Sequence, residues 1–228
     1  MKFIVIEGVD GAGKSTQIKL LTDFFSRRGH ICEYLHFPRT EAPYFGEMIA
    51  RFLRGEFGSL NDVDPYIVAM LYAGDRKDAS DMIREWLKEG KIVLLDRYTY
   101  SNIAYQCAKL HDLSEQNKLM KWILSLEFEH FGIPRPDLNI FLDVPSAFTE
   151  MKLSNSRSGN DRTYLNGTTD IHEESLLFQK SVRAVYLKVA LEDERLAVVD
   201  CSDGKGSMMS PEKIFDLITK IITERDII

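Results

Sequence analysis

Short runs of apolar, often β-branched residues alternate along the chain with longer stretches in which apolar residues recur every three or four positions. The short runs are typical of buried strands, and the longer stretches are typical of amphipathic helices. The strand-like runs are 2–6, 31–36, 92–95, 138–143 and 196–200. Strands that alternate with helices predict a parallel sheet covered on both faces, so we expect an α/β fold with five parallel strands.

The helical patterns are bounded by residues that favour helix ends. Asp64 and Ser210 each precede a proline, as an N-cap residue before an N1 proline does. The expected helices are 14–28, 44–53, 65–88, 98–109, 114–131, 170–191 and a last one that begins at Ser210. Positions 154–169 are instead rich in Ser, Asn and Gly and predict a mobile segment. No repeat or linker divides the chain, so we expect one domain over 1–228.

Composition narrows the functional classes. The 228 residues are 44% hydrophobic and 28% charged, and the formal net charge is −6. A negative balance argues against non-specific nucleic-acid binding, which depends on a positive field. No apolar run approaches the roughly 18 residues of a membrane span. Cys32, Cys107 and Cys201 lie too far apart in sequence for a Cys-x-x-Cys motif. We expect a soluble cytoplasmic protein with reduced cysteines and neither a nucleic-acid nor a membrane partner.

The strongest chemical signal follows the first strand. Residues 8–15 match the phosphate-loop pattern G-x-x-x-x-G-K-[ST] between a predicted strand and a predicted helix, and Thr16 follows the match. The loop residues are Gly8, Val9, Asp10, Gly11, Ala12, Gly13, Lys14, Ser15 and Thr16. Such a loop curls its backbone N–H groups around phosphates at a helix N-terminus. We expect Lys14 to reach the β- and γ-phosphates of a nucleotide and the Ser15 hydroxyl to coordinate Mg²⁺.

A phosphate loop by itself leaves several protein classes open. GTP-binding switches, partition-type ATPases and small-molecule kinases all contain one. Guanine-specific switches usually carry an Asn-Lys-x-Asp string that reads the base. The nearest string here, at 117–120, is Asn-Lys-Leu-Met and lacks the Asp. This weakens the switch interpretation without naming a reaction.

A second set of polar residues follows the second and third strands. Arg39 lies in Phe-Pro-Arg at 37–39, and Asp96 and Arg97 follow the third strand. Ligands of open α/β sheets bind outside the carboxyl ends of the strands, so both arginines should approach Lys14. Ser101 and Tyr105 are four positions apart and share one helix face.

These strings resemble the thymidylate kinase family of nucleoside monophosphate kinases, over nearly the whole chain. The resemblance depends on Phe-Pro-Arg at 37–39, Asp-Arg-Tyr-x-x-Ser-x-x-Ala-Tyr-Gln at 96–106, Asp-Ile-His-Glu at 170–173, and an acidic Asp10 in the phosphate loop. It implies a three-layer P-loop kinase fold and transfer of the γ-phosphoryl group of ATP to dTMP with Mg²⁺. The product would be dTDP, in dTTP biosynthesis.

The resemblance also implies roles around the transferred phosphoryl group. Arg39 and Arg97 would bind the acceptor phosphate, for which guanidinium forks are well suited. Asp10 would accept a hydrogen bond from the sugar 3′-hydroxyl and orient the acceptor. Asp96 would help to hold Mg²⁺ through water. Lys14, Asp10 and Arg97 thus form the catalytic set together with a cation supplied elsewhere.

Further residues would bind the nucleoside. By the resemblance, Tyr72 would stack on the pyrimidine, Arg76 would donate to a thymine carbonyl, and Tyr105 would crowd the 2′ position. Ser101 and Gln106 would read the base edge. The full expected substrate set is Asp10, Phe37, Arg39, Tyr72, Arg76, Arg97, Ser101, Tyr105 and Gln106.

One position departs from part of the family. Some members carry an arginine after the phosphate-loop Asp, where this chain has Gly11. In the other variety a lid supplies the catalytic cation, and Arg157 and Arg162 in the segment 154–169 are the candidates. The sequence does not choose between them. Another nucleoside or deoxynucleoside kinase, or a P-loop switch or partition ATPase, are the alternative functions.

The family resemblance further implies a homodimer. The apolar positions of the helices 65–88 and 98–109 could form its interface, but the same positions would also face the core of a monomer.

Overall fold

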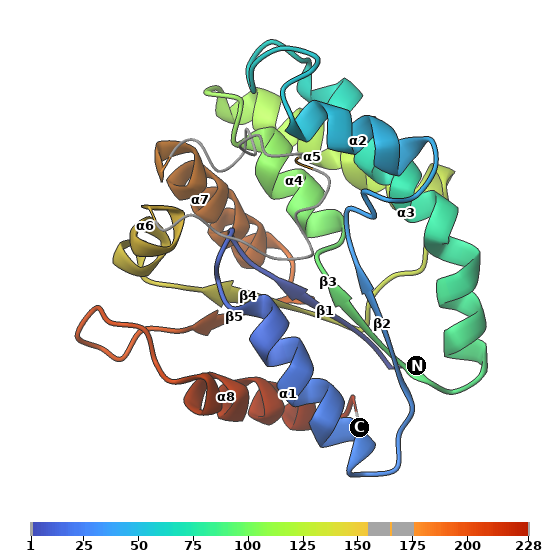
Figure 1. The fold of residues 1–228 in the computed structure, drawn as a ribbon, viewed down its shortest axis with the longest axis vertical. Coiled ribbons are helices and arrows are strands. Elements are labelled where there is room, and N and C mark those ends of the chain that lie inside the picture. The colour runs from blue at the N-terminus through green and yellow to red at the C-terminus, as the bar shows by residue number, and fades with distance from the viewer. Residues whose placement is uncertain (1, 155–164, 166–175, 228) are drawn as a thin grey trace.

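The fold is a five-stranded parallel sheet between two layers of helices (Figure 1). The structure is a computed structural model that describes residues 2–154, 165 and 176–227. The strands are β1 (Phe3–Glu7), β2 (Cys32–His36), β3 (Ile92–Asp96), β4 (Leu138–Asp143) and β5 (Leu196–Asp200). Their order is β2-β3-β1-β4-β5, and every neighbouring pair is parallel. The predicted α/β fold is confirmed.

The central strand β1 is buried on both faces, which explains its unbroken apolar sequence. Ile4 and Ile6 belong to a large core cluster that includes residues of α1 (Lys14–Ser26) and α8 (Pro211–Glu224). Phe3 and Val5 point to the other face, where they join a cluster with Ile83 of α3 (Pro65–Lys88). Alternate residues of one strand therefore hold both helical layers on the sheet.

Different helices form the two layers on either side of the sheet. The remaining elements of the described residues are α2 (Phe45–Leu53), α4 (Thr99–Cys107), α5 (Leu113–Leu124), the π-helical turn η1 (Ser125–His130), α6 (Ser146–Ser154) and α7 (Leu176–Glu192). In Figure 1, α1 and α8 lie side by side below the sheet, and α3, α4, α5 and α7 lie above it. All nine residues of α4 are buried, so α4 is an internal helix. Its apolar positions face the core of this chain and form no free dimer surface.

Two elements differ from the sequence prediction. We expected one helix over 114–131, but the α-helical pattern ends at Leu124 and a π-helical turn follows. We did not expect α6, which begins directly after Pro145. Six-residue π-turns and short helices leave little periodic signal, because the periodicity is read over windows of 11 or more residues.

The predicted mobile segment lies outside the described residues, apart from Ser154 at the end of α6 and Leu165. None of the helices that the structure describes is long and apolar enough to cross a membrane.

Candidate active site at the carboxyl edge of the sheet

The phosphate loop connects β1 to the first turn of α1. Gly11 and Gly13 have positive φ angles of 76° and 83°, a backbone conformation that glycine adopts without steric cost. Gly13 is the N-cap residue of α1, so the curl of the loop and the helix N-terminus face the same space. The hydroxyl-bearing Ser15 and Thr16 are exposed, as an oxygen ligand for a nucleotide-bound cation should be.

Lys14 lies between the loop and the end of β3. Its buried Nζ donates to the Val9 carbonyl at 3.3 Å and lies 3.8 Å from Oδ1 of Asp96. On the other side of Asp96, Nδ1 of His36 is 3.5 Å from Oδ2. Burial raises the pKa of Asp96, but Lys14, His36 and Arg97 outweigh it and hold the pKa below its ordinary value. Asp96 is therefore an ionised carboxylate at the strand end.

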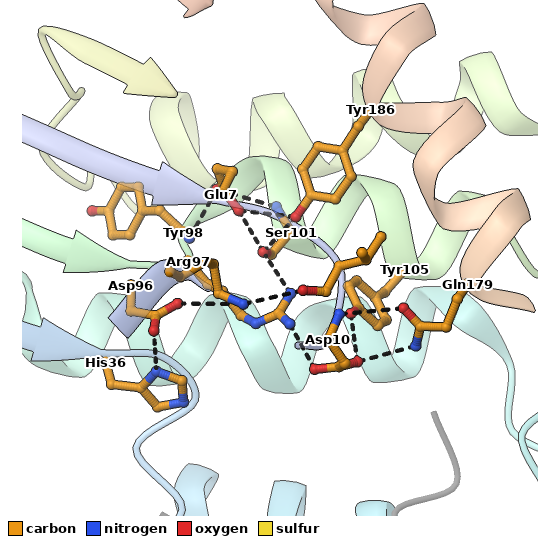
Figure 2. A network of polar contacts seen from close by, with 12 residues as sticks. Glu7, Asp10, His36, Asp96, Arg97, Tyr98, Ser101, Tyr105, Gln179 and Tyr186 are labelled. Carbon is orange, nitrogen blue, oxygen red and sulfur yellow. Dashed lines mark hydrogen bonds and ion pairs between the residues drawn. The ribbon is translucent and has the colours of Figure 1, made fainter. Parts of the chain in front are cut away.

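Asp10 connects the phosphate loop to the arginine that follows β3 (Figure 2). Its Oδ1 accepts from Nη2 of Arg97 at 2.8 Å. Its Oδ2 accepts from the Tyr105 hydroxyl at 2.7 Å and from Nε2 of Gln179 at 3.0 Å. Gln179 belongs to α7, so three distant parts of the chain, namely the loop itself, the segment 97–105 and α7, meet at the Asp10 carboxylate. The Arg97 guanidinium also lies 5.0 Å from the centre of the Tyr105 ring.

A buried carboxylate, Glu7, is connected to Arg97 through the Ser101 hydroxyl. Glu7, the last residue of β1, has no exposed surface. It accepts from the backbone N–H groups of Tyr98 and Ser101 at 3.0 and 3.3 Å. It also accepts from the hydroxyl groups of Ser101 and Tyr186 at 2.5 and 2.9 Å. Because α4 has no side-chain cap of its own, Glu7 satisfies N–H groups at its N-terminus from another strand.

Glu7 also interacts electrostatically with Arg97, whose backbone conformation is unusual. Arg97 has a positive φ of 68°, an uncommon conformation for a residue with a β-carbon. Its Nη1 donates to the Ser101 hydroxyl at 3.3 Å, and that hydroxyl in turn contacts Glu7. Burial raises the pKa of Glu7 above its ordinary value, although the Ser101 hydrogen bond and the Arg97 charge oppose this. Ser101 therefore links Arg97 to Glu7, where we expected it to read a base edge.

Arg39 lies against α3 in this structure. Its Nε donates to Oδ1 of Asp75 at 2.8 Å, and its Nη2 donates to Asp78 at 2.7 Å. A further bond joins its backbone N–H to Asp75 at 2.9 Å. These contacts orient the loop after β2, and they occupy two of the three guanidinium nitrogens that we expected on the acceptor phosphate.

Arg76 is fully buried and pairs with a residue far away in sequence. Its Nε and Nη2 donate to the two carboxylate oxygens of Glu127 in η1 at 2.7 and 2.6 Å. The partner is thus neither Asp75 nor Asp78, the acidic residues beside it in sequence. Because the ion pair uses Nε and Nη2, it leaves Nη1 of Arg76 outside the contact with Glu127.

The remaining expected nucleoside residues lie around these groups. Tyr72 is half-buried and packs against the cluster of Ile49, Phe52, Leu53 and Val68 between α2 and α3. Phe37 is buried beside Tyr98, with 5.7 Å between the ring centres. Gln106 is completely buried, and within the part of the chain that the structure describes neither atom of its amide has a hydrogen-bond partner. Arg157 and Arg162 lie outside the described residues.

Several residues of this region were not predicted from the sequence to lie at the site. They are His36, Asn102, Glu127, Gln179 and Tyr186. His36 had a readable signal, because it is the last residue of an expected strand and pairs in register with Asp96. The others come from helices and the π-turn, where sequence spacing does not show which face meets the site.

The fold and the site together define a class. A parallel sheet with a phosphate loop after its central strand, and a buried arginine at the neighbouring strand end, define a P-loop kinase. Lys14 and Arg97 lie at the same carboxyl edge of the sheet, where Lys14 pairs with Asp96 and Arg97 pairs with Asp10, so two cations are available there for phosphate groups.

Comparison with known proteins narrows this class. The family model described as thymidylate kinase matches residues 6–210. The thymidylate kinase of Mycobacterium tuberculosis is 35% identical over 189 residues, which are 83% of this chain and 86% of that protein. A probable thymidylate kinase of Thermococcus onnurineus is 37% identical over 203 residues, with 87% and 88% covered. A solved thymidylate kinase from Candida albicans shares the fold, with a TM-score of 0.72 at 24% identity over 99% of this chain and 92% of its own.

The chain therefore belongs to the thymidylate kinase family, and it is a nucleoside monophosphate kinase with ATP as the phosphoryl donor.

Proposed function

We infer that the protein transfers the γ-phosphoryl group of ATP to dTMP and forms dTDP and ADP. The observation that carries this function is the contact of Asp10 with Arg97, because it joins the donor loop to a buried guanidinium at 2.8 Å. It supports an arrangement in which a donor phosphate held by the loop would lie beside an acceptor phosphate held by Arg97.

The chemistry required of the protein is alignment and charge compensation. Phosphoryl transfer passes through a loose transition state, and the acceptor phosphate is already ionised, so no protein nucleophile is needed. Lys14 would bind the β- and γ-phosphates from within the loop, and Arg97 would hold the acceptor oxygen in line. Asp10, which already binds Arg97 and Tyr105, would fix that guanidinium and receive the sugar hydroxyl.

The residues of the loop region fit Mg²⁺. The Oδ1 of Asp96 is buried without a hydrogen-bond partner among the described residues, and its pKa lies below the ordinary value. No group of three His, Cys, Asp or Glu side chains within the described ranges could hold a metal by itself. Mg²⁺ usually binds one or two protein oxygens together with phosphates and water, which Ser15 and Asp96 would provide. Bound there, it would neutralise charge on the nucleotide phosphates.

The base would be read between α3 and α4. Nδ2 of Asn102 donates to the Ala69 carbonyl at 3.0 Å and to Glu127 at 2.9 Å, which leaves Oδ1 as a buried acceptor without a partner among the described residues. Arg76 and Asn102 are neighbours, because both bind the same oxygen of Glu127, and Nη1 of Arg76 would supply a donor close to this acceptor. A donor next to an acceptor complements the O4 carbonyl and N3–H of thymine. Cytosine presents the opposite pair, a donor and an acceptor.

Tyr105 would select the sugar. Its ring is held by the hydrogen bond to Asp10 and by an edge contact with Phe178 at 6.1 Å between ring centres. A ring fixed beside Arg97 would leave no space for a ribose 2′-hydroxyl on a nucleotide whose phosphate Arg97 holds.

We also place this protein in the cytoplasm as a homodimer. Its three cysteines are free thiols, as in a reducing compartment. Since α4 is internal, the dimer surface would use α3, where Ile67 and Met70 are 52% and 47% exposed on one helix face. Light scattering of the wild type and of Ile67→Lys tests the assembly. A monomeric wild type, or a variant that stays dimeric, would exclude this surface.

A panel of acceptors tests the reaction. A coupled assay of ADP release with ATP and Mg²⁺ compares dTMP with dCMP, UMP, AMP and thymidine. We expect dTMP to have the highest kcat/KM. Equal or faster turnover of dCMP, UMP or AMP refutes the acceptor assignment. Phosphorylation of thymidine in preference to dTMP would identify a deoxynucleoside kinase, and hydrolysis of ATP without any acceptor activity would identify a switch or partition ATPase.

A further inference from the structure

A second buried polar cluster outside the phosphate loop surrounds Glu127. This residue has no exposed surface and lies in the π-helical turn η1 that follows α5. Its carboxylate receives four hydrogen bonds from two other helices. Oε1 accepts from Arg76 Nη2 at 2.6 Å and from Asn102 Nδ2 at 2.9 Å. Oε2 accepts from Arg76 Nε at 2.7 Å and from the Thr99 hydroxyl at 2.8 Å.

These contacts saturate the carboxylate. An ionised carboxylate offers about four lone-pair positions, and all of them are used here. The burial of a charged pair is favourable only when geometry and hydrogen bonding are nearly complete, and this pair meets that condition. Glu127 is therefore unable to accept a hydrogen bond from a ligand without giving up a protein contact. Its effect on a substrate must pass through its partners.

Glu127 leaves one hydrogen-bonding atom outside its contacts on each of two partners, a donor on Arg76 and an acceptor on Asn102. The fork contact fixes the plane of the Arg76 guanidinium and leaves Nη1 outside the contact. The orientation of the Asn102 amide is fixed by two acceptors that Nδ2 faces, Glu127 and the Ala69 carbonyl. Oδ1 must then be the unpartnered acceptor. Without the carboxylate, only the Ala69 carbonyl favours this orientation, so the inverted amide, with a donor where the acceptor now stands, costs less free energy.

The π-turn provides the location for this carboxylate. A π-turn changes the angular position of side chains relative to the α-helix before it, and such turns often mark functional sites. Here the α-helix ends at Leu124, and Glu127 is the one residue of η1 that is buried.

We propose that Glu127 is a positioning residue for base selection, which holds the Arg76 guanidinium and the Asn102 amide in the donor and acceptor order that fits thymine. This inference depends on the proposed function, since it concerns how the same site chooses its acceptor base. It adds a residue that touches no substrate and acts through two that do.

The direct test is Glu127→Gln, which preserves size and removes the charge and one acceptor oxygen. Because a hydrogen bond to a charged group is lost at Arg76, we expect the KM for dTMP to rise about 10- to 100-fold. The preference for dTMP over dCMP in kcat/KM should fall about tenfold or more, while the KM for ATP stays within about twofold. A fall in all parameters in parallel with the melting temperature, or an unchanged preference, overturns the proposal in favour of a merely structural role.

A matched control and a double-variant cycle sharpen this result. Glu33→Gln removes a carboxylate that pairs with Lys91 at 2.6 Å on the edge strand β2, and it should leave the base preference unchanged. In an Arg76→Lys background, Glu127→Gln should cause a smaller further loss of preference than in the wild type, because one part of its effect passes through that guanidinium and the other part through Asn102. Independent, additive losses would contradict the proposal.

A crystal structure of the wild type with dTMP decides the question without any variant, including the case in which Glu127→Gln does not fold. We expect Arg76 to keep both bonds to Glu127 while Nη1 contacts the base. A base bound elsewhere, or an Arg76 released from Glu127, overturns the inference. A wild type that does not phosphorylate dTMP refutes the proposed function. An active wild type whose preference for dTMP is unchanged by Glu127→Gln refutes only the role of Glu127.

Discussion

The free-energy cost of burying the Lys109 ammonium group in the core can be measured. Its Nζ is buried without a hydrogen-bond partner among the described residues and lies 4.8 Å from the centre of the Phe52 ring. Burial lowers the pKa of Lys109 from 10.5 to about 7, and the negative charge of Asp64 only partly opposes this. The residue lies after α4 and has no place in the proposed mechanism, so a change there should affect stability and leave kcat unaltered.

The sign of the effect follows from proton linkage. Between pH 7 and 10.5 the unfolded chain retains a proton that the folded chain releases, so the free energy of unfolding rises with pH across this window. Below pH 7 both states are protonated, and the cost of the buried ammonium group is fully present. A shift from 10.5 to about 7 corresponds to an upper limit of about 5 kcal/mol at roughly 1.4 kcal/mol per unit.

Lys109→Met removes the charge and keeps a side chain of similar length. We expect it to raise the free energy of unfolding at pH 6 by about 1–4 kcal/mol, with a gain that shrinks towards zero by pH 10. Urea unfolding at pH 6, 8 and 10 measures this. Lys118→Met, at an exposed position of α5, is the control and should show no such pH-dependent gain. A variant that is no more stable than the wild type at pH 6, or a gain independent of pH, would refute the reasoning.

The other predictions concern catalysis. Lys14→Ala should lower kcat about 100-fold or more, since preorganised charge at the transferred group is lost; near-normal turnover would show that Lys14 does not contact the phosphates. Arg157→Ala combined with Arg162→Ala should also lose kcat, and a fully active double variant would exclude both as the additional cation. Glu7→Gln should raise the KM for dTMP about tenfold through Arg97 while the KM for ATP changes little, because the arginine loses its buried counter-charge. Equal changes in both KM values would contradict this.

A matched control is available for the phosphate loop. Lys19 lies exposed on α1, five residues after Lys14. Lys19→Ala removes the same charge outside the site and should leave kcat unchanged, which separates a local role of Lys14 from a general effect of net charge.

The sheet could be predicted because buried parallel strands have an unmistakable sequence form. The run Ile92–Leu95 must be apolar on both faces of the sheet, and it was found to within one residue. The phosphate loop could also be predicted, since the spacing from Gly8 to Ser15 reflects the local geometry of a single turn. The helix over 114–131 was wrong in its last part, where the π-turn interrupts the regular pattern.

Side-chain partners were harder to predict than elements. For Arg76, the sequence pointed to its acidic neighbours, whereas the structure pairs it with Glu127, 51 residues away. Ser101 shares the helix face with Tyr105 as expected, yet its hydroxyl lies between Arg97 and Glu7. No sequence signal distinguished Asn102, because an amide on a helix can recognise one particular base only when its other hydrogen bonds fix its orientation.

The sequence alone determined which functional segments follow which strands. A phosphate loop follows the first strand, an arginine follows the third strand, and a helix of expected nucleoside-binding residues comes after that arginine. These features are local, since each depends on residues within about ten positions of one another. Tertiary structure decided which charges meet. A buried carboxylate is stabilised by whatever donors the packing of strands and helices brings to it, and Glu7 and Glu127 receive theirs from segments that no sequence spacing connects.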